Sequence, residues 1–293
     1  MNITAVCRQL GYSKRSCYKS LRLGKIRTCH RGEVLRRVMA LRGQMPRLGT
    51  RKLHHLLKES FSGDGIVVGR DGLFRLLREE DLLVRKKRRY TKTTDFSHCM
   101  RRYLDLAKGL ELQRPEQLWV ADITYLSLGY SYLHLITDAY SRKIIGYHVS
   151  QTLAASSTIK ALEGALKNRS CNEQLTHHSD RGLQYCSSQY TRLLSQHGVG
   201  ISMTQDDSPY DNAIAERVNG ILKDEFGLDE VFTTHDEAVH QVMESINIYN
   251  NQRPHISNSM LTPDEMHRQK SLVPRKWHKK TKRTLEGSFG FLP

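Results

Sequence analysis

The 293-residue sequence lacks the features that mark membrane, secreted and zinc-binding proteins. No stretch is long and apolar enough for a membrane span, and residues 1 to 8 contain no secretory apolar region. The six cysteines include no Cys-x-x-Cys pair, and the nearby histidines do not supply the spacing of a zinc finger. These absences predict a protein of the cytoplasm or nucleoid, with reduced thiols and without a structural zinc site.

Acidic residues are scarce at both ends of the chain. Residues 1 to 110 contain 27 Lys and Arg against 9 Asp and Glu, and residues 268 to 293 contain 8 against 1. Residues 111 to 267 reverse this balance, with 11 against 20, and the whole chain carries +16. Basic flanks gain affinity for DNA by releasing counterions from phosphates, whereas an acidic middle repels DNA unless cations neutralise it. The distribution indicates basic arms that bind DNA on either side of a core that needs cations to approach it.

Three carboxylates in the acidic middle form a candidate metal site. Asp122 is the one acid in a pattern typical of a buried strand, residues 118 to 126. Asp180 is expected at a strand end, where Gly182 turns the chain, and 35 residues separate it from Glu216. Such a trio can hold two divalent metal ions against a phosphodiester. Each acid alone has an ordinary alternative, as a satisfied core aspartate, a turn residue or a solvated helix position.

Glu216 belongs to a strong helical pattern over residues 211 to 226. The apolar stripe of this pattern consists of Ile214, Val218, Ile221 and Leu222. The opposite stripe consists of Asn212, Glu216, Gly220 and Lys223. Because this second stripe faces away from the core, with a small residue beside the glutamate and a lysine two turns along, it is suited to admit a phosphate backbone. We therefore predict that Asn212 and Lys223 contact DNA.

Six ordered motifs carry a resemblance to a known family. They are WVADITY at 119 to 125, TDAYSRKIIG at 137 to 146, HSDRGLQY at 178 to 185, YDNAIAE at 210 to 216, YNNQRPH at 249 to 255 and LTPDE at 261 to 265. Together they resemble the integrase core of bacterial insertion-sequence transposases, specifically the OrfB-type proteins of insertion-sequence family three. The resemblance implies an α/β, ribonuclease-H-like core over residues 115 to 267, with a mixed five-stranded sheet and flanking helices. It also implies that Asp122, Asp180 and Glu216 are the Asp-Asp-Glu catalytic and metal-binding triad.

One departure from the family pattern lies beside this triad. Many relatives carry Ser-Phe-Phe after the glutamate, whereas residues 217 to 220 are Arg-Val-Asn-Gly here. The substitution keeps the helix and alters the groups next to the metal site. The His-His-Cys-Cys zinc module of retroviral integrases is also absent, which favours an insertion-sequence transposase over a retroviral enzyme.

The resemblance implies DNA cleavage at insertion-sequence ends followed by strand transfer, with two magnesium ions for which manganese should substitute. The implied partners are double-stranded DNA of the terminal repeats and target, further copies of the chain, and an OrfA-type part. No sustained heptad occurs, so the chain looks like the OrfB part alone. Two alternatives stay open: a non-catalytic, element-encoded DNA-binding regulator, and a ribonuclease H, which the basic arms disfavour.

Residues 1 to 84 are predicted to be a helical DNA-binding region with one or two helix-turn-helix-like units. Residues 4 to 10 and 13 to 21 are expected to form two short helices. A second unit would combine a helix from residue 49, a loop at 63 to 65 and a helix at 70 to 80. On that last helix, Arg70, Arg75 and Arg78 are candidate DNA contacts, the alternative being ordinary exposed arginines of a small packing domain.

Basic segments flank the predicted core. Residues 85 to 114 are expected to be a linker that tracks DNA or is merely solvated, and residues 268 to 293 a basic tail. The basic run in the linker is Arg85, Lys86, Lys87, Arg88 and Arg89. A helix over residues 233 to 250 and another that starts at Pro263, after a Thr262 cap, should complete the core. Between them, Arg253 and His255 either reach DNA or are structural.

Overall fold

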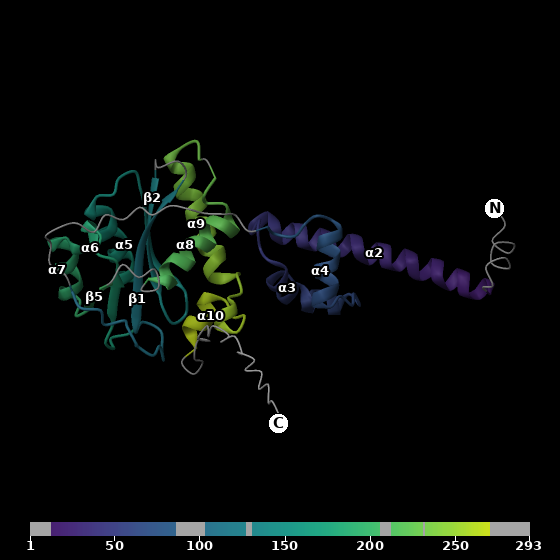
Figure 1. Ribbon diagram of the computed structural model, residues 1–293, viewed down its shortest axis with the longest axis horizontal. Helices are drawn as coiled ribbons and strands as arrows, with labels where there is room; N and C mark the ends of the chain where they lie inside the picture. The colour runs from purple at the N-terminus through teal and green to yellow at the C-terminus, as the bar shows by residue number, and fades with distance from the viewer. Residues whose placement is uncertain (1–12, 86–102, 127–130, 206–211, 231, 270–293) are drawn as a thin grey trace, which may run out of the picture.

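The computed structural model describes residues 13–85, 103–126, 131–205, 212–230 and 232–269. Figure 1 shows a helical region, formed by α2 to α4, beside an α/β core in which helices lie on both sides of a sheet. None of the helices in these ranges combines the length and the apolar character that a membrane span requires.

Five strands form one mixed sheet in the order β3-β2-β1-β4-β5. The strands are β1 (Leu118–Leu126), β2 (Ser131–Asp138), β3 (Ile144–Ser150), β4 (Thr176–Ser179) and β5 (Gly200–Met203). β1 to β3 pair antiparallel, whereas β4 runs parallel to β1 and β5 runs parallel to β4. The predicted strand at 118 to 126 is confirmed, and this sheet confirms the ribonuclease-H-like α/β fold.

Helices cover both faces of the sheet. On one face, α5 (Ala155–Lys167), α6 (Leu183–Cys186) and α7 (Ser188–Gln196) enclose a cluster that includes Trp119 and Ile136. On the other face, α8 (Ala213–Phe226) and α9 (His235–Asn251) pack over Leu133 and Leu135. Successive side chains of a strand point to opposite faces, so β1 and β2 contribute to both clusters. Both strands are therefore buried along most of their length.

The helices that complete the core follow the sequence signals. The four apolar positions predicted for α9 are all buried: Ala238, Val242, Ile246 and Tyr249. α10 (Pro263–Arg268) begins after Thr262, which forms a capping box with Glu265. Both predicted helices are confirmed.

The helical region contains α2 (Lys14–Gln44), α3 (Thr50–Gly63) and α4 (Arg70–Glu79). The predicted pair formed by α3 and α4 is confirmed, and its buried side chains include Leu53, Phe61 and Leu73. The prediction that a helix would end near residue 21 is wrong, because α2 continues to Gln44. No proline interrupts residues 14 to 44, and Glu33 pairs with the arginines three and four residues later. Residues 1 to 12, with the other expected short helix, lie outside the described residues.

Part of the predicted linker belongs to the core. Met203 N donates a hydrogen bond to the Leu104 carbonyl at 3.4 Å, and Leu106 N donates one to Ser202 Oγ at 2.8 Å. These bonds place the start of residues 103 to 114 beside β5. The description of that stretch as a linker is therefore corrected, because its backbone is paired with the sheet. Residues 86 to 102 and the tail from residue 270 are not among the described residues.

Candidate active site

Asp122 lies on β1, the central strand of the sheet, and is partly buried. Its Oδ1 accepts a hydrogen bond from Ile123 N at 2.9 Å, and its Oδ2 accepts one from Asn219 Nδ2 at 2.7 Å. Burial and the negative charge of Asp180 raise the pKa of Asp122 to about 7, and the charge of Glu216 adds to this rise. Asp180 and Glu216 are thus both close enough for their charges to act on Asp122.

Asp180 directly follows β4, the parallel neighbour of β1. The register pairs Val120 of β1 with His178 of β4. Asp122 and Asp180 lie two residues beyond this pair, Asp122 within β1 and Asp180 just after the end of β4. Gly182 N donates a hydrogen bond to Asp180 Oδ1 at 3.0 Å. A Cβ at Gly182 would lie 3.0 Å from that oxygen, so glycine leaves the carboxylate room as well as turning the chain.

Glu216 lies in the first turn of α8 and is exposed as a whole residue. Partial burial of its carboxylate raises its pKa. Asn212, just before α8, donates from Nδ2 to the carbonyl oxygen of Ala121 at 2.9 Å. Asn212 is only 8% exposed, and its contact with DNA stays a prediction. Because this amide is turned inward onto β1, it positions the start of α8 beside Asp122.

The chemistry of these side chains fits a divalent cation. Carboxylate oxygens are hard ligands of the kind that magnesium and manganese prefer. The charges of Asp180 and Glu216 both raise the pKa of Asp122, and a bound cation would offset that repulsion. Within the described part of the chain, no three Asp, Glu, His or Cys side chains are gathered as they stand into a metal-holding group. The acids therefore match a metal in donor type and charge, while their side chains do not converge on one point.

Asn219 is a site residue that the sequence reasoning missed. It is buried one turn along α8 from Glu216, and its Nδ2 holds Asp122. Its Oδ1 is buried and makes no hydrogen bond to a described residue. An amide beside the apolar Val218 and Ile221 is the sequence signal that could have identified it.

Tyr185 on α6 also borders the acids and was not predicted. Burial, followed by the charges of Asp180 and Asp122, raises the pKa of Tyr185 well above its ordinary value. The phenol therefore stays neutral beside the two aspartates. No pattern in the sequence distinguishes this tyrosine from the others.

The predicted DNA contacts lie in different places. Arg70, Arg75 and Arg78 are exposed on α4. Arg85 is exposed and pairs with Asp81 at 2.9 Å. The other members of the basic run, Lys86, Lys87, Arg88 and Arg89, lie outside the described residues.

The structure also gives the burial of Lys223 and of the two residues after α9, Arg253 and His255. Lys223 is partly buried two turns along α8 from Glu216. Arg253 and His255 are both buried, which confirms the structural alternative for them.

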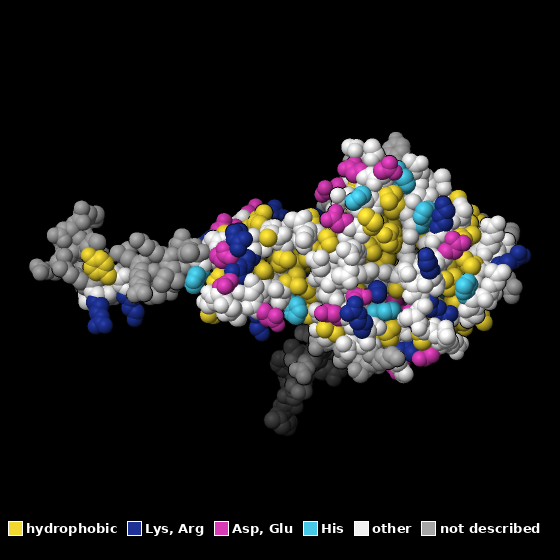
Figure 2. Space-filling view, turned by 180° about the vertical axis from the view of Figure 1, so that it is seen from behind, with side chains coloured by type: hydrophobic (Ala, Val, Ile, Leu, Met, Phe, Trp, Pro, Cys, Tyr) yellow, Lys and Arg dark blue, Asp and Glu magenta, His cyan; other side chains and the backbone are white. Residues whose placement is uncertain are grey.

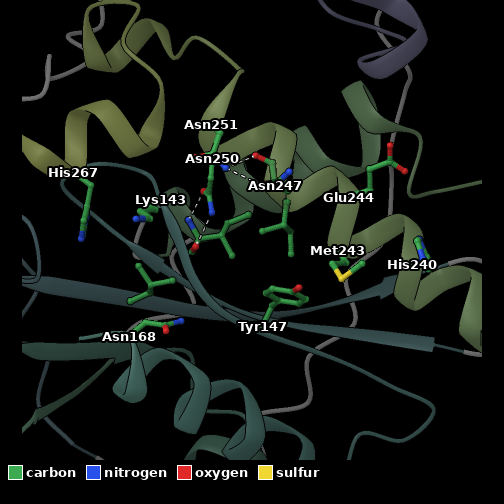
Figure 3. Close-up of a pocket in the computed structure, with 13 residues that line it drawn as sticks. Lys143, Tyr147, Asn168, His240, Met243, Glu244, Asn247, Asn250, Asn251 and His267 are labelled. Atoms are coloured by element: carbon green, nitrogen blue, oxygen red, sulfur yellow. Dashed lines mark hydrogen bonds between the residues drawn. The ribbon is translucent and has the colours of Figure 1, made fainter. Parts of the chain in front are cut away.

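A hollow of about 930 Å³ lies between β3 and α9, and none of the three acids lines it (Figure 3). Its lining includes Tyr147, Met243 and Asn250. Asn250 accepts from Ile144 N at 3.0 Å and donates to the Ile144 carbonyl at 2.9 Å. These bonds satisfy part of the free edge of β3, so the hollow is a feature of that edge rather than of the acid cluster.

Comparisons with known proteins show the family of this chain. Residues 113–209 and 197–263 match the integrase core domain family. An uncharacterized 31 kDa protein of insertion element IS600 from Shigella sonnei is 38% identical over 223 residues, which cover 73% of this chain and 79% of that protein. The chain belongs to the integrase-core transposases of bacterial insertion sequences. It is thus a polynucleotidyl transferase by family.

Other similar proteins match a smaller part of this chain. Transposase InsF of insertion sequence IS3A from Escherichia coli (strain K12) is 35% identical, over 52% of this chain and 54% of the relative. The magnesium-bound catalytic core domain of the HTLV-2 integrase is 21% identical, with a TM-score of 0.42, over 53% of this chain and 97% of that one. The chain therefore spans about half the length of InsF.

Proposed function

We propose that this transposase cleaves DNA at insertion-sequence ends and joins the freed 3′ ends to target DNA, with Asp122, Asp180 and Glu216 as its catalytic and metal-binding residues. The main support is the mutual charge interaction of these acids, which contributes to the raised pKa of Asp122, about 7. Ionised carboxylates in a partly buried site ordinarily have a cationic partner or several hydrogen-bond donors. A site that brings two further acids close enough to raise the pKa of Asp122 is suited to bind metal ions.

The protein's own groups would orient the acids. Asn219 Nδ2 holds one oxygen of Asp122, and Gly182 N holds one oxygen of Asp180. Each carboxylate keeps further lone pairs for ligation. Two magnesium ions held by the three acids would supply an activated nucleophile and charge stabilisation at the scissile phosphate, and manganese should substitute for them.

The rest of the chain would bind DNA. We assign DNA binding to residues 1 to 84, through Arg70, Arg75 and Arg78 on α4, and to the basic run at residues 85 to 89. Lys223 would contact the DNA that enters the site along α8. The proposed partners are the terminal repeats and target DNA, further copies of the chain, and an OrfA-type part. The proposed place of action is the cytoplasm, on the nucleoid.

Incubation of the full chain with labelled insertion-sequence ends and magnesium, resolved on a denaturing gel, tests this function. Asp122→Asn, Asp180→Asn and Glu216→Gln should each reduce cleavage and joining by at least about 1000-fold, because metal activation contributes several kcal/mol of transition-state stabilisation. Each variant should keep wild-type affinity for DNA.

Glu244→Gln serves as the matched control, because it neutralises an exposed acid on α9 that lines the hollow rather than the site. Its activity should equal that of the wild type. Near-normal strand transfer by any triad variant would contradict the assignment. A wild-type chain that binds the ends without cutting them would instead support the regulator.

A further inference from the structure

A buried ionic joint connects the helical region to the helix that carries Glu216. Lys52 Nζ, on α3, lies 2.7 and 3.0 Å from the carboxylate oxygens of Glu225, in the last turn of α8. Arg253, just after α9, donates from Nε and Nη2 to the same carboxylate at 2.8 and 2.9 Å. The side chains of Lys52, Glu225 and Arg253 are 9%, 15% and 1% exposed. We call these three side chains the ionic joint.

The main chain strengthens the same connection. Arg47 N, between α2 and α3, donates a hydrogen bond to the Glu225 carbonyl oxygen at 3.1 Å. The last carbonyls of a helix lack partners within the helix, so this bond caps α8 from the helical region. The Arg47 side chain also donates to the Arg85 carbonyl, and Arg42 donates to the Leu82 carbonyl at 2.7 Å. The segment that follows α4 is therefore held at the ionic joint.

α8 extends from the ionic joint to the acid cluster. Glu216 and Glu225 are nine positions apart on this helix, about 13.5 Å along its axis. Between them, Val218 and Ile221 are buried against the core, and Asn219 holds Asp122. A shift of the joint along the helix axis would therefore move both Glu216 and the amide that orients Asp122.

Electrostatics make this connection specific. Burial would raise the pKa of Glu225, but the charges and hydrogen bonds of Arg253 and Lys52 outweigh it and hold the pKa at about 2. Burial and the charge of Arg253 lower the pKa of Lys52 to about 8, because two cations share one carboxylate. Buried charges are costly unless the partner geometry is good. The joint therefore favours one arrangement of the two regions, where apolar packing alone would tolerate sliding.

We propose that the ionic joint transmits DNA binding by the helical region to the active site, with Lys52 and Glu225 acting as positioning residues for Glu216. The inference rests on the proposed function. DNA bound at α4 would act on the segment after that helix, which Arg47 connects to the end of α8. The far end of α8 carries Glu216, so the position of the bound DNA and that of the catalytic acid are set together.

Lys52→Gln in the full chain tests the joint, because it removes the charge and keeps an N–H donor. At saturating DNA, and at a temperature where circular dichroism shows the variant fully folded, its cleavage rate should fall about tenfold, since small misplacements of catalytic groups are costly. Its affinity for DNA should stay within about twofold, because the phosphate contacts are elsewhere. Lys52→Arg, which restores the charge, should recover most of the rate.

Lys143→Met is the matched control. It removes an ion pair of the same length, Lys143 Nζ to Asp264 Oδ1 at 2.7 Å, that lies within the core. The control should cleave at the wild-type rate. A wild-type rate in Lys52→Gln, or an equal loss in Lys143→Met, would overturn the proposal.

Hydrogen exchange, measured on the wild-type chain and on Lys52→Gln, gives a readout that does not depend on catalysis. Duplex DNA should slow the exchange of backbone amides in the last two turns of α8, and Lys52→Gln should lose this protection. Unchanged exchange in α8 when DNA is bound would refute the joint, even if the wild type cleaves. If the wild type binds DNA and never cleaves it, the proposed function fails. The hydrogen exchange of α8 then still shows whether the ionic joint couples DNA binding to this helix.

Discussion

The charged side chains of the helical region and those of the core have opposite kinds of neighbours. In the helical region, acidic and basic side chains lie side by side on the surface (Figure 2), as when Arg31 pairs with Glu79 and Glu80. Exposed pairs of this kind contribute little to stability, and the excess of cations faces solvent. In the core, Asp122 is enclosed near two further acids. This contrast is the basis for the proposal that the helical region binds DNA and the core binds metal ions.

The boundary between the regions is the instructive exception. Arg31 and Glu79 are 42% and 49% exposed, whereas Lys52 and Glu225 are 9% and 15% exposed, although both are ion pairs of 2.7 Å. The same chemistry therefore serves two purposes. On the surface it tunes the charge of the region, and at the boundary it fixes how the two regions meet.

We expect the largest effect on the difference between the two regions from neutralising Asp122 in the core. Without metal, Asp122→Asn should raise the melting temperature at pH 8 by several degrees, since one pKa unit is worth about 1.4 kcal/mol. The pKa of Asp122 in the folded chain, about 7, lies above that of an unfolded aspartate. As pH falls through 7, the folded state takes up the proton first and the wild type gains stability; above pH 7 the cost is fully present.

Calorimetry at pH 5 and pH 8, with and without magnesium, measures both effects. Magnesium should stabilise the wild type more at pH 8, where Asp122 is ionised, and should lose most of this effect on the variant. Asp264→Asn is the control of opposite sign. Burial would raise the pKa of Asp264, but Lys143, with the charges of Arg268 and His267, lowers it, so neutralising Asp264 should reduce stability at pH 8. Destabilisation by Asp122→Asn, with magnesium still effective, would remove the acid cluster as a metal site.

Local patterns predicted much of the fold. The apolar run of β1, the periodicity of α9 and the Thr262 cap each depend on neighbours in sequence, and the structure confirms all three. The extension of α2 was missed because the glycines in residues 22 to 44 were compatible with a break that tertiary packing and ion pairs overrode. Local sequence thus identifies elements better than their ends.

Partners distant in sequence could not be predicted. Helical periodicity placed Asn212 on the stripe opposite the apolar one, yet it bonds to the Ala121 carbonyl, 91 residues away. Lys52 and Glu225 are 173 residues apart, and nothing in either segment identifies the other. The three acids were found because an ordered set of motifs carried them. Their charge coupling depends on the parallel register of β1 and β4, which only the folded sheet provides.

The positive surface of the helical region can be tested by replacing Arg70, Arg75 and Arg78 together with glutamine. If each contacts one phosphate, the slope of log affinity against log salt should decrease in magnitude by about 3. The control removes the same charge from exposed positions on α5 and α7, through Lys160→Gln, Lys167→Gln and Arg192→Gln. Equal slopes for the two triple variants would mean that net charge, rather than α4, attracts the DNA.

The smallest expected effect comes from replacing Lys223, a cation on the same helix as Glu216. This variant separates DNA binding from metal binding within the core. Lys223→Ala should weaken binding of insertion-sequence ends about tenfold and reduce the salt slope by about 1, as expected for one lost phosphate contact. Magnesium-induced stabilisation should be unchanged, because seven residues of helix, about 10.5 Å, separate Lys223 from Glu216. Lys160→Ala, on α5, should leave both measurements at wild-type values. Unchanged DNA affinity with lost magnesium stabilisation would assign Lys223 to the acid cluster instead of to the DNA path.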